Sequence, residues 1–468
     1  MKLTRRIIER ISLVLCLVLV LTGVMYVIEI NANGQKWLNR ASNARIAKAR
    51  QTTIQGTVYD RNLKPLSWSV NPGTREYIND LETRLALAHT IGEQTNQNSS
   101  GVEYRHATTL LGMDATRTDL TMQSLSGDVP EGDNLTLTVD AELTKYIYSL
   151  FPENAMGACV IINYKTGAIL GKVSLPTFDP AHMEFKAEDT AYRDRVLQEQ
   201  YAPGSTFKIV VLEAALENLA GIANEHFNCL GVWNLGKYSI SCAGGNVHGE
   251  LTLHDAFAKS CNVSFSSIAY QVGAEALKKV AERFGFNTLF NFADIVMNPS
   301  HCLDHSMSDG EVIQAGIGQG KTQVTPLHMA MISGAIANGG VMMEPKLIKQ
   351  VTNHAGETVS TMHESVYTTV ATPAQCELLS RYLLYATENG TGTSAKVSGL
   401  TVCGKTGSAE WTSNKNVATN AWYTGFVSGD PAHPYAIAVV VEQGGYGSST
   451  AAPIAAKVLQ KAYELNVY

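Results

Sequence analysis

Three short motifs that contain serine or lysine occur in order along the chain, and together they suit nucleophilic chemistry. They are STFK at 205–208, SCN at 260–262 and KTG at 405–407. Each motif alone is weak, because a serine three residues before a lysine arises by chance in a chain of this length. KTG also occurs at 165–167, between two apolar runs, where it is typical of a hairpin turn. The order of the three motifs therefore carries the prediction.

The first motif offers an alcohol and an amine one helical turn apart. At a helix start, Ser205 would point its hydroxyl toward unpaired backbone N–H groups and the positive end of the helix dipole. Lys208 would share its face of the helix. Because an ammonium group cannot accept a proton, Lys208 must be held neutral to act as a base. Partial burial and a second cation nearby, Lys405, would both lower the pKa of Lys208.

The other two motifs offer groups that would bind a substrate and move its protons. The backbone N–H groups of Ser205 and Ser408 would form an oxyanion hole, and losing one such donor typically slows a reaction by about 10²–10³-fold. Ser260 suits proton transfer to a leaving amine, and Asn262 suits binding of a substrate amide. The residues expected to bind substrate along the KTG segment are Lys405, Thr406, Gly407 and Ser408.

The segments around these motifs predict an α+β domain that begins near residue 134. LTLTVD and ACVIINYKTGAILGKV are predicted strands. The helix that carries STFK begins at Pro203 and Gly204 and has Phe207 and Val210 on its buried face. Three predicted strands, TVCGKTGSAEW, NAWYTGFVSG and YAIAVVVEQ, precede a closing helix at 451–465. This order predicts an antiparallel sheet with helices packed on it.

An uncharged apolar run, ISLVLCLVLVLTGVMYVI, occupies residues 11–28 near the N-terminus. Eighteen helical residues at about 1.5 Å each span roughly 27 Å, close to the hydrocarbon core of a bilayer. Lys2, Arg5, Arg6 and Arg10 precede the run and are expected to stay in the cytoplasm. A cleaved signal peptide would have a shorter apolar region and a small-x-small site. We therefore expect a single-pass anchor in the cell membrane, with the rest of the chain outside the cytoplasm.

The overall composition excludes several classes of protein. With 45% hydrophobic residues among 468, the chain can build a sizeable core and is not disordered throughout. The net charge of −6 argues against nucleic acid as the main partner, because phosphate binding needs a basic surface. The length predicts about three units. We predict a tail and anchor at 1–30, a polar pedestal or dimerisation-like domain at 31–140 and the domain with all three motifs at 141–468.

The eight cysteines predict at most one cross-link. An exported domain permits disulfides, and Cys229 and Cys242 flank a short glycine-rich stretch that a disulfide could close. The alternative, which we favour for the other cysteines including Cys261, is a small buried side chain. HCLDH at 301–305 has no second pair of ligands nearby, so no metal site is predicted.

The three motifs in this order resemble the penicillin-binding protein and serine β-lactamase superfamily. The resemblance extends to YAPGSTFK, GIGQGKTQVTPLHMA, IANGG, GTG at 390–392, CGKTGSAEW and TGAILGKVSLPTFDP, and to VYDRN and GVEYRHATTLLG in the pedestal. Together these segments look like a class B penicillin-binding protein and cover essentially the whole chain. The resemblance implies a small pedestal, a central antiparallel sheet flanked by helices, an all-α subdomain and no cofactor.

The resemblance implies a peptidoglycan D,D-transpeptidase of bacterial cell-wall synthesis. Ser205 would attack the penultimate D-Ala carbonyl of a stem peptide and expel the terminal D-Ala, and an amine of a neighbouring stem would take the acyl group. A β-lactam would trap Ser205 as an ester. The implied partners are lipid-linked peptidoglycan and a multispanning glycosyltransferase of the shape, elongation, division or sporulation type, which would dock on the anchor helix and the pedestal.

Other activities on the same scaffold stay open at this point. A class A β-lactamase needs a glutamate that activates water, commonly in E-x-x-L-N, and no such motif lies between Asn262 and Lys405. A penicillin sensor usually has a hydrophobic residue in place of Asn262. A D,D-carboxypeptidase differs only in its acceptor, and a non-catalytic scaffold would not need every catalytic side chain. The positions that depart from the class B pattern are Gln55, Leu63, Asp194 and Ser408.

Overall fold

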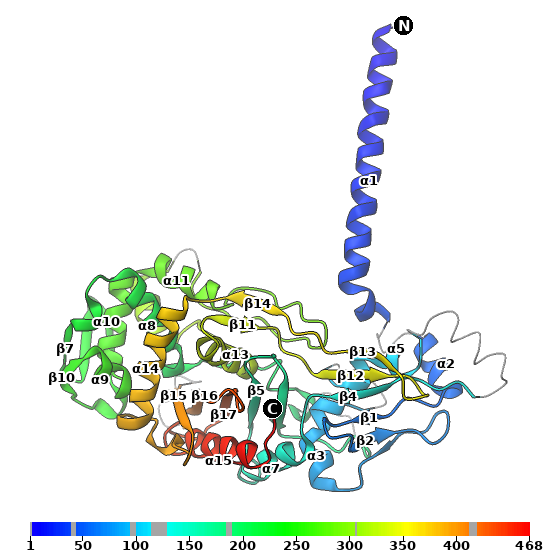
Figure 1. Cartoon of the computed structure of the whole chain (residues 1–468). Coiled ribbons are helices and arrows are strands. Elements are labelled where there is room, and N and C mark those ends of the chain that lie inside the picture. The colour runs from blue at the N-terminus through cyan, green and yellow to red at the C-terminus, as the bar shows by residue number, and fades with distance from the viewer. Residues whose placement is uncertain are drawn as a thin grey trace.

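The computed structural model describes residues 2–38, 44–93, 100–113, 129–183, 190–304, 307–410 and 419–468. Its first helix, α1 (Lys2–Leu38), stands as a long rod away from the body of the molecule (Figure 1). The 20 residues Arg10–Glu29 are long and apolar enough to cross a membrane, and none of this span is buried. It is the one helix of this kind among the described residues.

A five-stranded antiparallel sheet forms the centre of the molecule. Its strand order, β15-β16-β17-β5-β6, joins an early strand pair to three late strands. The strands are β5 (Gly157–Asn163), β6 (Ile169–Leu175), β15 (Thr401–Ala409), β16 (Asn420–Ser428) and β17 (Tyr435–Val441). The predicted α+β fold with a central antiparallel sheet is confirmed. The KTG segment lies in β15, at the edge of the sheet.

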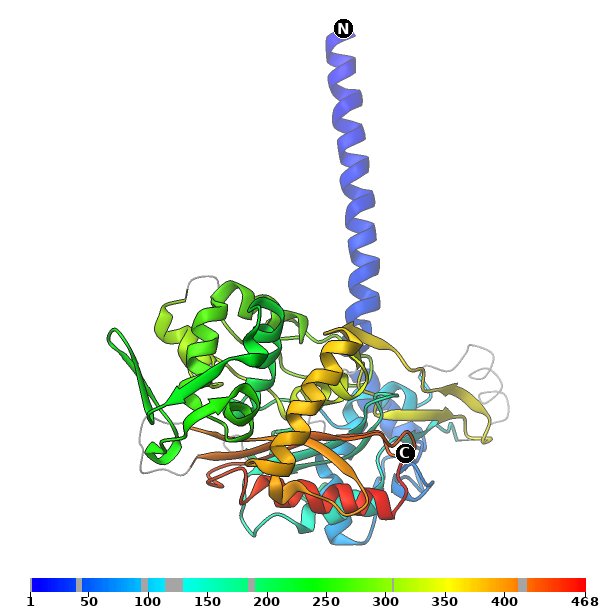
Figure 2. The same ribbon diagram turned by 60° about the vertical axis from the view of Figure 1, so that its left-hand side comes forward.

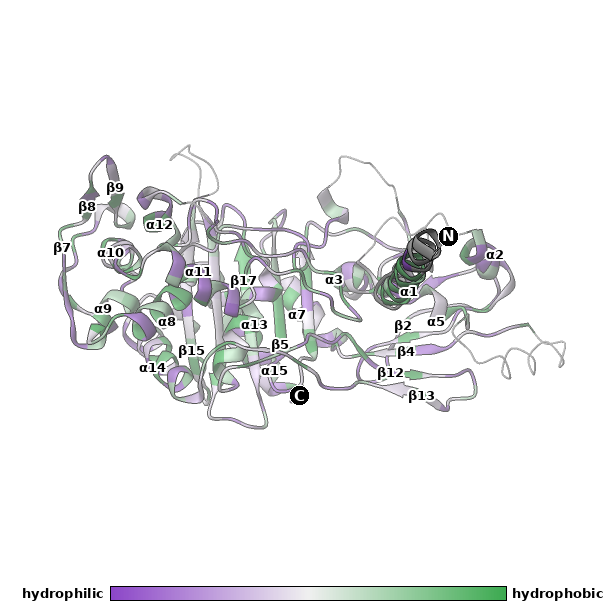
Figure 3. Ribbon diagram, turned by 90° about the horizontal axis from the view of Figure 1, so that it is seen from above, coloured by the Kyte–Doolittle hydropathy of each residue, from purple (hydrophilic) through white to green (hydrophobic). Residues whose placement is uncertain are grey.

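Helices cover both faces of this sheet. Successive side chains of a strand point to opposite faces. In β5, Val160 belongs to the apolar cluster that contains α13 (Pro326–Ala337), whereas Ile161 belongs to the cluster that contains α7 (Ala141–Ser149) and α15 (Ala451–Glu464). In Figure 1, α13 lies above the sheet and α15 below it. Hydrophobic residues accordingly gather in β5, β17 and α13 (Figure 3). A strand that is buried on both faces has a nearly continuous apolar sequence.

A helical subdomain lies beside the edge strand β15 (Figure 2). Its helices are α8 (Lys208–Asn218), α9 (Leu253–Ala258), α10 (Asn262–Val272), α11 (Ala274–Arg283) and α12 (Asp309–Ala315). Two antiparallel pairs join them: β7 (His226–Cys229) with β10 (Gly249–Thr252), and β8 (Val232–Leu235) with β9 (Tyr238–Ser241). The subdomain predicted to be all-α therefore also contains short strands. Side chains along β8 alternate between exposed and half-buried, which is typical of a hairpin with one face against the protein.

A second, six-stranded sheet forms the pedestal, in the order β13-β12-β4-β1-β2-β3. Its strands are β1 (Val58–Tyr59), β2 (Pro65–Trp68), β3 (Glu76–Tyr77), β4 (Asn134–Leu137), β12 (Ile348–Thr352) and β13 (Thr358–Thr361). β4 pairs in parallel with β1 and antiparallel with β12. The sheet therefore crosses the domain boundary predicted at residue 140, because two of its strands come from the late part of the chain.

The remaining elements complete the pedestal and the wall of the helical subdomain. They are α2 (Ala44–Thr52), α3 (Leu81–Ile91), α4 (Val102–Arg105), α5 (Ala107–Leu110), α14 (Pro373–Asn389) and the pair β11 (Val341–Met343) with β14 (Val366–Thr369). α14 begins with a capping box in which Thr372 and Gln375 satisfy each other's backbone N–H groups.

The turn between β1 and β2 connects the pedestal to the central domain. Asp60, which is 2% exposed, accepts the N–H groups of Asn62 and Lys64 at Oδ1, both at 2.9 Å. Its Oδ2 accepts the N–H of Ala141, at the start of α7, at 3.2 Å. Asn62 Nδ2 also donates to Asp140 Oδ2 at 2.8 Å. A buried carboxylate therefore holds the pedestal turn against α7.

We expect Asp60→Ala to lower the free energy of unfolding by about 2–4 kcal/mol, because three backbone N–H groups lose a charged acceptor. Urea unfolding of the full-length protein in detergent measures this change. The exposed neighbour Lys64 serves as the control, and Lys64→Ala should change stability by less than about 0.5 kcal/mol. Equal stability of Asp60→Ala and the wild type would contradict the interpretation.

Candidate active site

Ser205 lies on a short 3-10 turn, η2 (Gly204–Phe207), which leads directly into α8. Gly204 has a φ of +54°, and a Cβ added there would lie 3.0 Å from the carbonyl oxygen of Ser408. The N–H of Gly204 donates to the carbonyl of Gly318 at 2.9 Å. The turn is thus held between β15 on one side and the 316–320 loop on the other, and only glycine fits this position without strain.

Lys208, the first residue of α8, is fully buried. Its Nζ donates to Asn262 Oδ1 and to the carbonyl of Ser260, both at 2.8 Å, and lies 3.3 Å from Ser260 Oγ. Burial lowers the pKa of Lys208 to about 7, although the nearby Cys261 and Cys242 act in the opposite direction. A substantial fraction of neutral amine is therefore available near neutral pH.

Lys405 in β15 is also fully buried and approaches Ser260 from the other side. Its Nζ donates to Ser260 Oγ at 3.0 Å and to the carbonyl of Thr406 at 2.9 Å. Burial, together with the charge of Lys208, holds the pKa of Lys405 well below its usual range. The Ser260 hydroxyl consequently lies between two amines, where it can pass a proton from one to the other.

The SCN segment forms a tight turn between α9 and α10. Ser260 has a φ of +57°, a left-handed conformation that is uncommon for residues other than glycine. Asn262 begins α10, and its Nδ2 donates to the carbonyl of Ser241 in β9 at 3.1 Å while its Oδ1 accepts from Lys208. One N–H of the Asn262 amide remains for a substrate. Asn262 thus also positions Lys208, a role that the sequence did not indicate.

The three motifs line one groove of about 220 Å³. The motif residues at its surface are Ser205, Ser260, Asn262, Thr406, Gly407 and Ser408. Lys208 and Lys405 lie behind this surface, buried by the same elements. Gly407 keeps the strand close to the nucleophile turn, because a Cβ there would lie 2.9 Å from the carbonyl oxygen of Pro203. The structure therefore brings together every residue that the sequence singles out for catalysis and substrate binding.

The contact between the expected nucleophile and the expected base takes a different form from the prediction. Among the described residues, no hydrogen bond joins Ser205 Oγ to Lys208 Nζ, whose partners are Ser260 and Asn262. Hydrogen bonds of catalytic groups are often long or poorly aligned before a substrate binds. The arrangement suits a nucleophile that faces the groove and a base that is held in place by the SCN turn.

The family model of the penicillin binding protein transpeptidase domain matches residues 157–460, which include all three motifs. The chain belongs to this family. The class B resemblance seen in the sequence is confirmed.

Similar proteins extend the comparison beyond the matched domain. The chain is 29% identical over 364 residues to the peptidoglycan D,D-transpeptidase PbpA of Mycolicibacterium smegmatis. This alignment covers 70% of this chain and 72% of that protein. The D,D-transpeptidase domain of a peptidoglycan glycosyltransferase from Eggerthella lenta is 29% identical, with a TM-score of 0.75 over 88% of this chain and 99% of that one. Penicillin-binding protein A of M. tuberculosis, solved as a ceftriaxone acyl-enzyme complex, shares the fold at 24% identity, with a TM-score of 0.79 over 89% and 99%.

Two departures from the penicillin-binding protein pattern have structural explanations. Asp194 is buried and forms an ion pair with Lys172 of β6, so it stabilises the region beside the sheet. Ser408 keeps a hydroxyl in the groove, and this hydroxyl accepts the N–H of Gly447 at 3.2 Å. Neither change removes a group from the proposed chemistry.

Several groove residues were not singled out from the sequence. Thr391 places its hydroxyl 2.5 Å from that of Thr406, and the GTG resemblance at 390–392 was a signal for it. Gln319 comes from the GIGQGKTQVTPLHMA segment, which contributed to the family resemblance without indicating this side chain. Tyr446 and Ser448 follow β17 in an irregular segment, and no sequence pattern marked them.

The turn and cysteine predictions have different outcomes. The KTG copy at 165–167 is the predicted hairpin turn between β5 and β6, with Gly167 at a φ of +83°.

The disulfide between Cys229 and Cys242 is not present, because both are free thiols whose Sγ atoms lie 3.6 Å apart, well beyond the bond length of about 2.05 Å. His305 of the HCLDH segment lies outside the described residues.

Proposed function

We propose that this chain is a peptidoglycan D,D-transpeptidase that works through an acyl-enzyme on Ser205. One observation carries the proposal: Ser205, the buried amine of Lys208 and the edge strand β15 meet at a single groove in a chain of the penicillin-binding protein family. The relatives named peptidoglycan D,D-transpeptidase support the same reaction.

The proposed acylation starts with neutral Lys208 taking the proton of Ser205 Oγ. The oxygen forms a bond to the penultimate D-Ala carbonyl of a stem peptide, and the backbone N–H groups of Ser205 and Ser408 stabilise the oxyanion. The carbon–nitrogen bond to the terminal D-Ala then breaks. An amine of a neighbouring stem attacks the ester, forms the new amide and releases Ser205.

Ser260 supplies the proposed route for the proton of the leaving amine. Its hydroxyl is 3.3 Å from Lys208 Nζ and 3.0 Å from Lys405 Nζ. The proton that Lys208 takes from Ser205 can therefore pass through Ser260 to the departing D-Ala nitrogen, while Lys405 and Thr406 bind the terminal carboxylate. Because both lysines are buried, water does not compete for these contacts.

Reaction of the full-length protein with penicillin in detergent tests this proposal. A β-lactam resembles D-Ala-D-Ala, so its ring amide should open on Ser205 and leave a stable ester. Mass spectrometry of the protein and its peptides should show one adduct, located on Ser205. An adduct on any other residue, or none, would contradict the assignment.

The rate of penicillin acylation should rise with pH and level off above about pH 7, because only neutral Lys208 can accept the proton. A group whose pKa is about 7 is about 1% neutral at pH 5 and about 50% neutral at pH 7, so the rate should increase about 50-fold. Stopped-flow acylation across this range measures the profile. A rate independent of pH between 5 and 7 would exclude Lys208 as the base.

A D,D-carboxypeptidase would share the acyl-enzyme and transfer the acyl group to water. Incubation with uncross-linked peptidoglycan strands that carry pentapeptide stems separates the two activities. A transpeptidase gives cross-linked dimers, whereas a carboxypeptidase gives only stems that lack the terminal D-Ala. We expect dimers as the main product.

We propose that Arg10–Glu29 anchors the protein in the cytoplasmic membrane with the groove outside, and that a multispanning glycosyltransferase docks on α1 and the pedestal. Asp60 is buried, whereas Asn62, Leu63 and Lys64 of the pedestal turn are exposed, and Leu63 is 65% exposed. Leu63→Asp should weaken stimulation of the glycosyltransferase with an unchanged melting temperature. Undiminished stimulation would argue against docking through this turn.

A further inference from the structure

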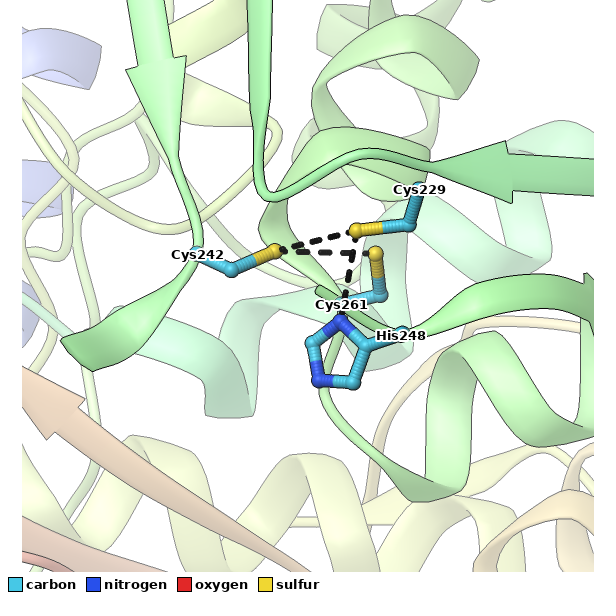
Figure 4. A group of neighbouring side chains, drawn as sticks. All are labelled: Cys229, Cys242, His248 and Cys261. Atoms are coloured by element: carbon cyan, nitrogen blue, oxygen red, sulfur yellow. Dashed lines mark hydrogen bonds between the residues drawn. The ribbon is translucent and has the colours of Figure 1, made fainter. Parts of the chain in front are cut away.

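Four side chains with metal-binding atoms converge behind the SCN turn: Cys229, Cys242, His248 and Cys261 (Figure 4). Their donor atoms all lie within 4.8 Å of one another. They come from four separate places, namely the end of β7, the segment after β9, the segment before β10 and the residue that precedes α10. We propose that this cluster is a structural Zn²⁺ site with three cysteine ligands and one histidine ligand.

The spacing of the donor atoms matches the edges of a zinc tetrahedron. The Sγ atoms of Cys229 and Cys242 are 3.6 Å apart, those of Cys242 and Cys261 are 3.7 Å apart, and Cys229 Sγ is 3.3 Å from His248 Nδ1. With Zn–S of about 2.3 Å and Zn–N of about 2.0 Å, a regular tetrahedron has S–S edges of about 3.8 Å and S–N edges of about 3.5 Å. Three of the six donor pairs thus already lie close to the separations that zinc requires, and the other three pairs lie within 4.8 Å.

The donor set favours zinc over other cations. Three thiolates and one imidazole are soft or borderline ligands that suit a tetrahedral d¹⁰ ion, whereas Ca²⁺ and Mg²⁺ prefer oxygen. Four protein ligands close the coordination sphere, which is typical of a structural site. Binding of Zn²⁺ releases the three thiol protons and leaves a centre with a net charge of −1.

The surrounding protein supports the ligands. The three cysteines are buried, and His248 is half-buried. Cys261 is the N-cap of α10, and its Sγ accepts hydrogen bonds from the N–H of Ser264 at 3.4 Å and from the Ser264 hydroxyl at 3.1 Å. Hydrogen bonds to sulfur and the positive end of a helix both stabilise a thiolate, as outer contacts do in metal sites.

The site connects the β8–β9 hairpin to the residues of the groove. Cys242 follows Ser241, whose carbonyl accepts from Asn262, and Cys261 lies between Ser260 and Asn262. His248 itself lines the groove. On the proposed function, zinc would therefore act as a positioning device that keeps the strained turn at Ser260 and the amide of Asn262 in place against Lys208.

Metal analysis of the full-length protein, purified in detergent without chelators, tests the proposal. Inductively coupled plasma mass spectrometry should find about one zinc per chain, and Cys242→Ser or Cys261→Ser should lose nearly all of it. Cys302→Ser is the matched control, because Cys302 is equally buried but lies outside the cluster. Loss of zinc in Cys302→Ser with retention in Cys242→Ser would overturn the assignment.

The wild-type protein provides a second test that does not depend on the folding of a variant. Replacing the metal with Co²⁺ should produce thiolate-to-cobalt charge-transfer bands and the strong visible bands of tetrahedral cobalt. Alkylation of the native protein should modify Cys229, Cys242 and Cys261 only after a chelator is added. A zinc-free protein with a Cys229–Cys242 disulfide would refute the site.

Penicillin labelling in the same samples separates this proposal from the proposed function. A protein that is purified without zinc but acylated at Ser205 at full rate would refute the metal site and leave the transpeptidase assignment intact. A zinc-loaded protein that penicillin does not acylate would refute the transpeptidase assignment and leave the metal site intact. We expect removal of zinc from the wild type to slow acylation and to lower the melting temperature.

Discussion

Ser205→Ala should abolish the covalent penicillin adduct, with a loss in acylation rate of at least about 10⁴-fold. Among the other serines of the groove, Ser260 is the one whose hydroxyl lies close to two amines, those of Lys208 and Lys405. Position decides between them, because the expected oxyanion donors are the N–H of Ser205 itself and that of Ser408, whose backbone lies against the nucleophile turn at Gly204. Mass spectrometry after long incubation with penicillin measures the loss.

Two further variants test whether the loss of the adduct is specific to Ser205. Ser260→Ala should slow acylation by about 10²-fold and still leave the adduct on Ser205, because it removes a proton carrier and not the nucleophile. Ser398→Ala, an exposed serine before β15, should react like the wild type. If Ser260→Ala lost the adduct while Ser205→Ala kept it, the roles of the two serines would have to be exchanged.

Lys208→Met should slow acylation by about 10³-fold, within the range typical of a lost general base. Methionine has a similar length and no branch, so it fills the buried space without a group that accepts a proton. The rate that remains should no longer rise between pH 5 and pH 7, because the titrating amine is gone. Stopped-flow acylation over the same pH range as for the wild type measures both effects.

The same change removes the donor to Asn262 Oδ1 and the Ser260 carbonyl, so the fold must be checked separately. A melting temperature within a few degrees of the wild type, together with Ser205 that reacts slowly but detectably, would indicate a purely chemical defect. An unchanged acylation rate would mean that another group takes the proton of Ser205, and Lys405 would then be the candidate.

The sequence predicted the central fold because its strands are buried on both faces. Runs such as those of β5 and β17 have no charged residue, and the buried Lys172 of β6 forms an ion pair with Asp194 and donates to the carbonyl of His89. The pedestal was harder to predict, because β1 and β3 have two residues each and β12 joins them from more than 200 residues later. Short strands that pair over long distances leave little local periodicity.

The site was predicted at the level of residues but not of contacts. The order of the three motifs and their resemblance to penicillin-binding proteins predicted that Ser205, Lys208 and Lys405 come together at one site. The partners of Lys208 depend on the left-handed turn at Ser260, which no local pattern signals. The thiol cluster was missed for a similar reason: its ligands follow the spacing C-x12-C-x5-H-x12-C, which is wider than the usual short pairs.

The sheet that β12 and β13 share with β4 fixes the position of the groove relative to the pedestal. Because β12 forms a ladder with β4 and β4 with β1, the pedestal cannot pivot on a single linker at residue 140. These ladders and the Asp60 contact to α7 join the pedestal and the central domain into one rigid unit. The distance from the pedestal to Ser205 is then nearly constant, so a partner protein bound to the pedestal would stay at one fixed distance from the nucleophile.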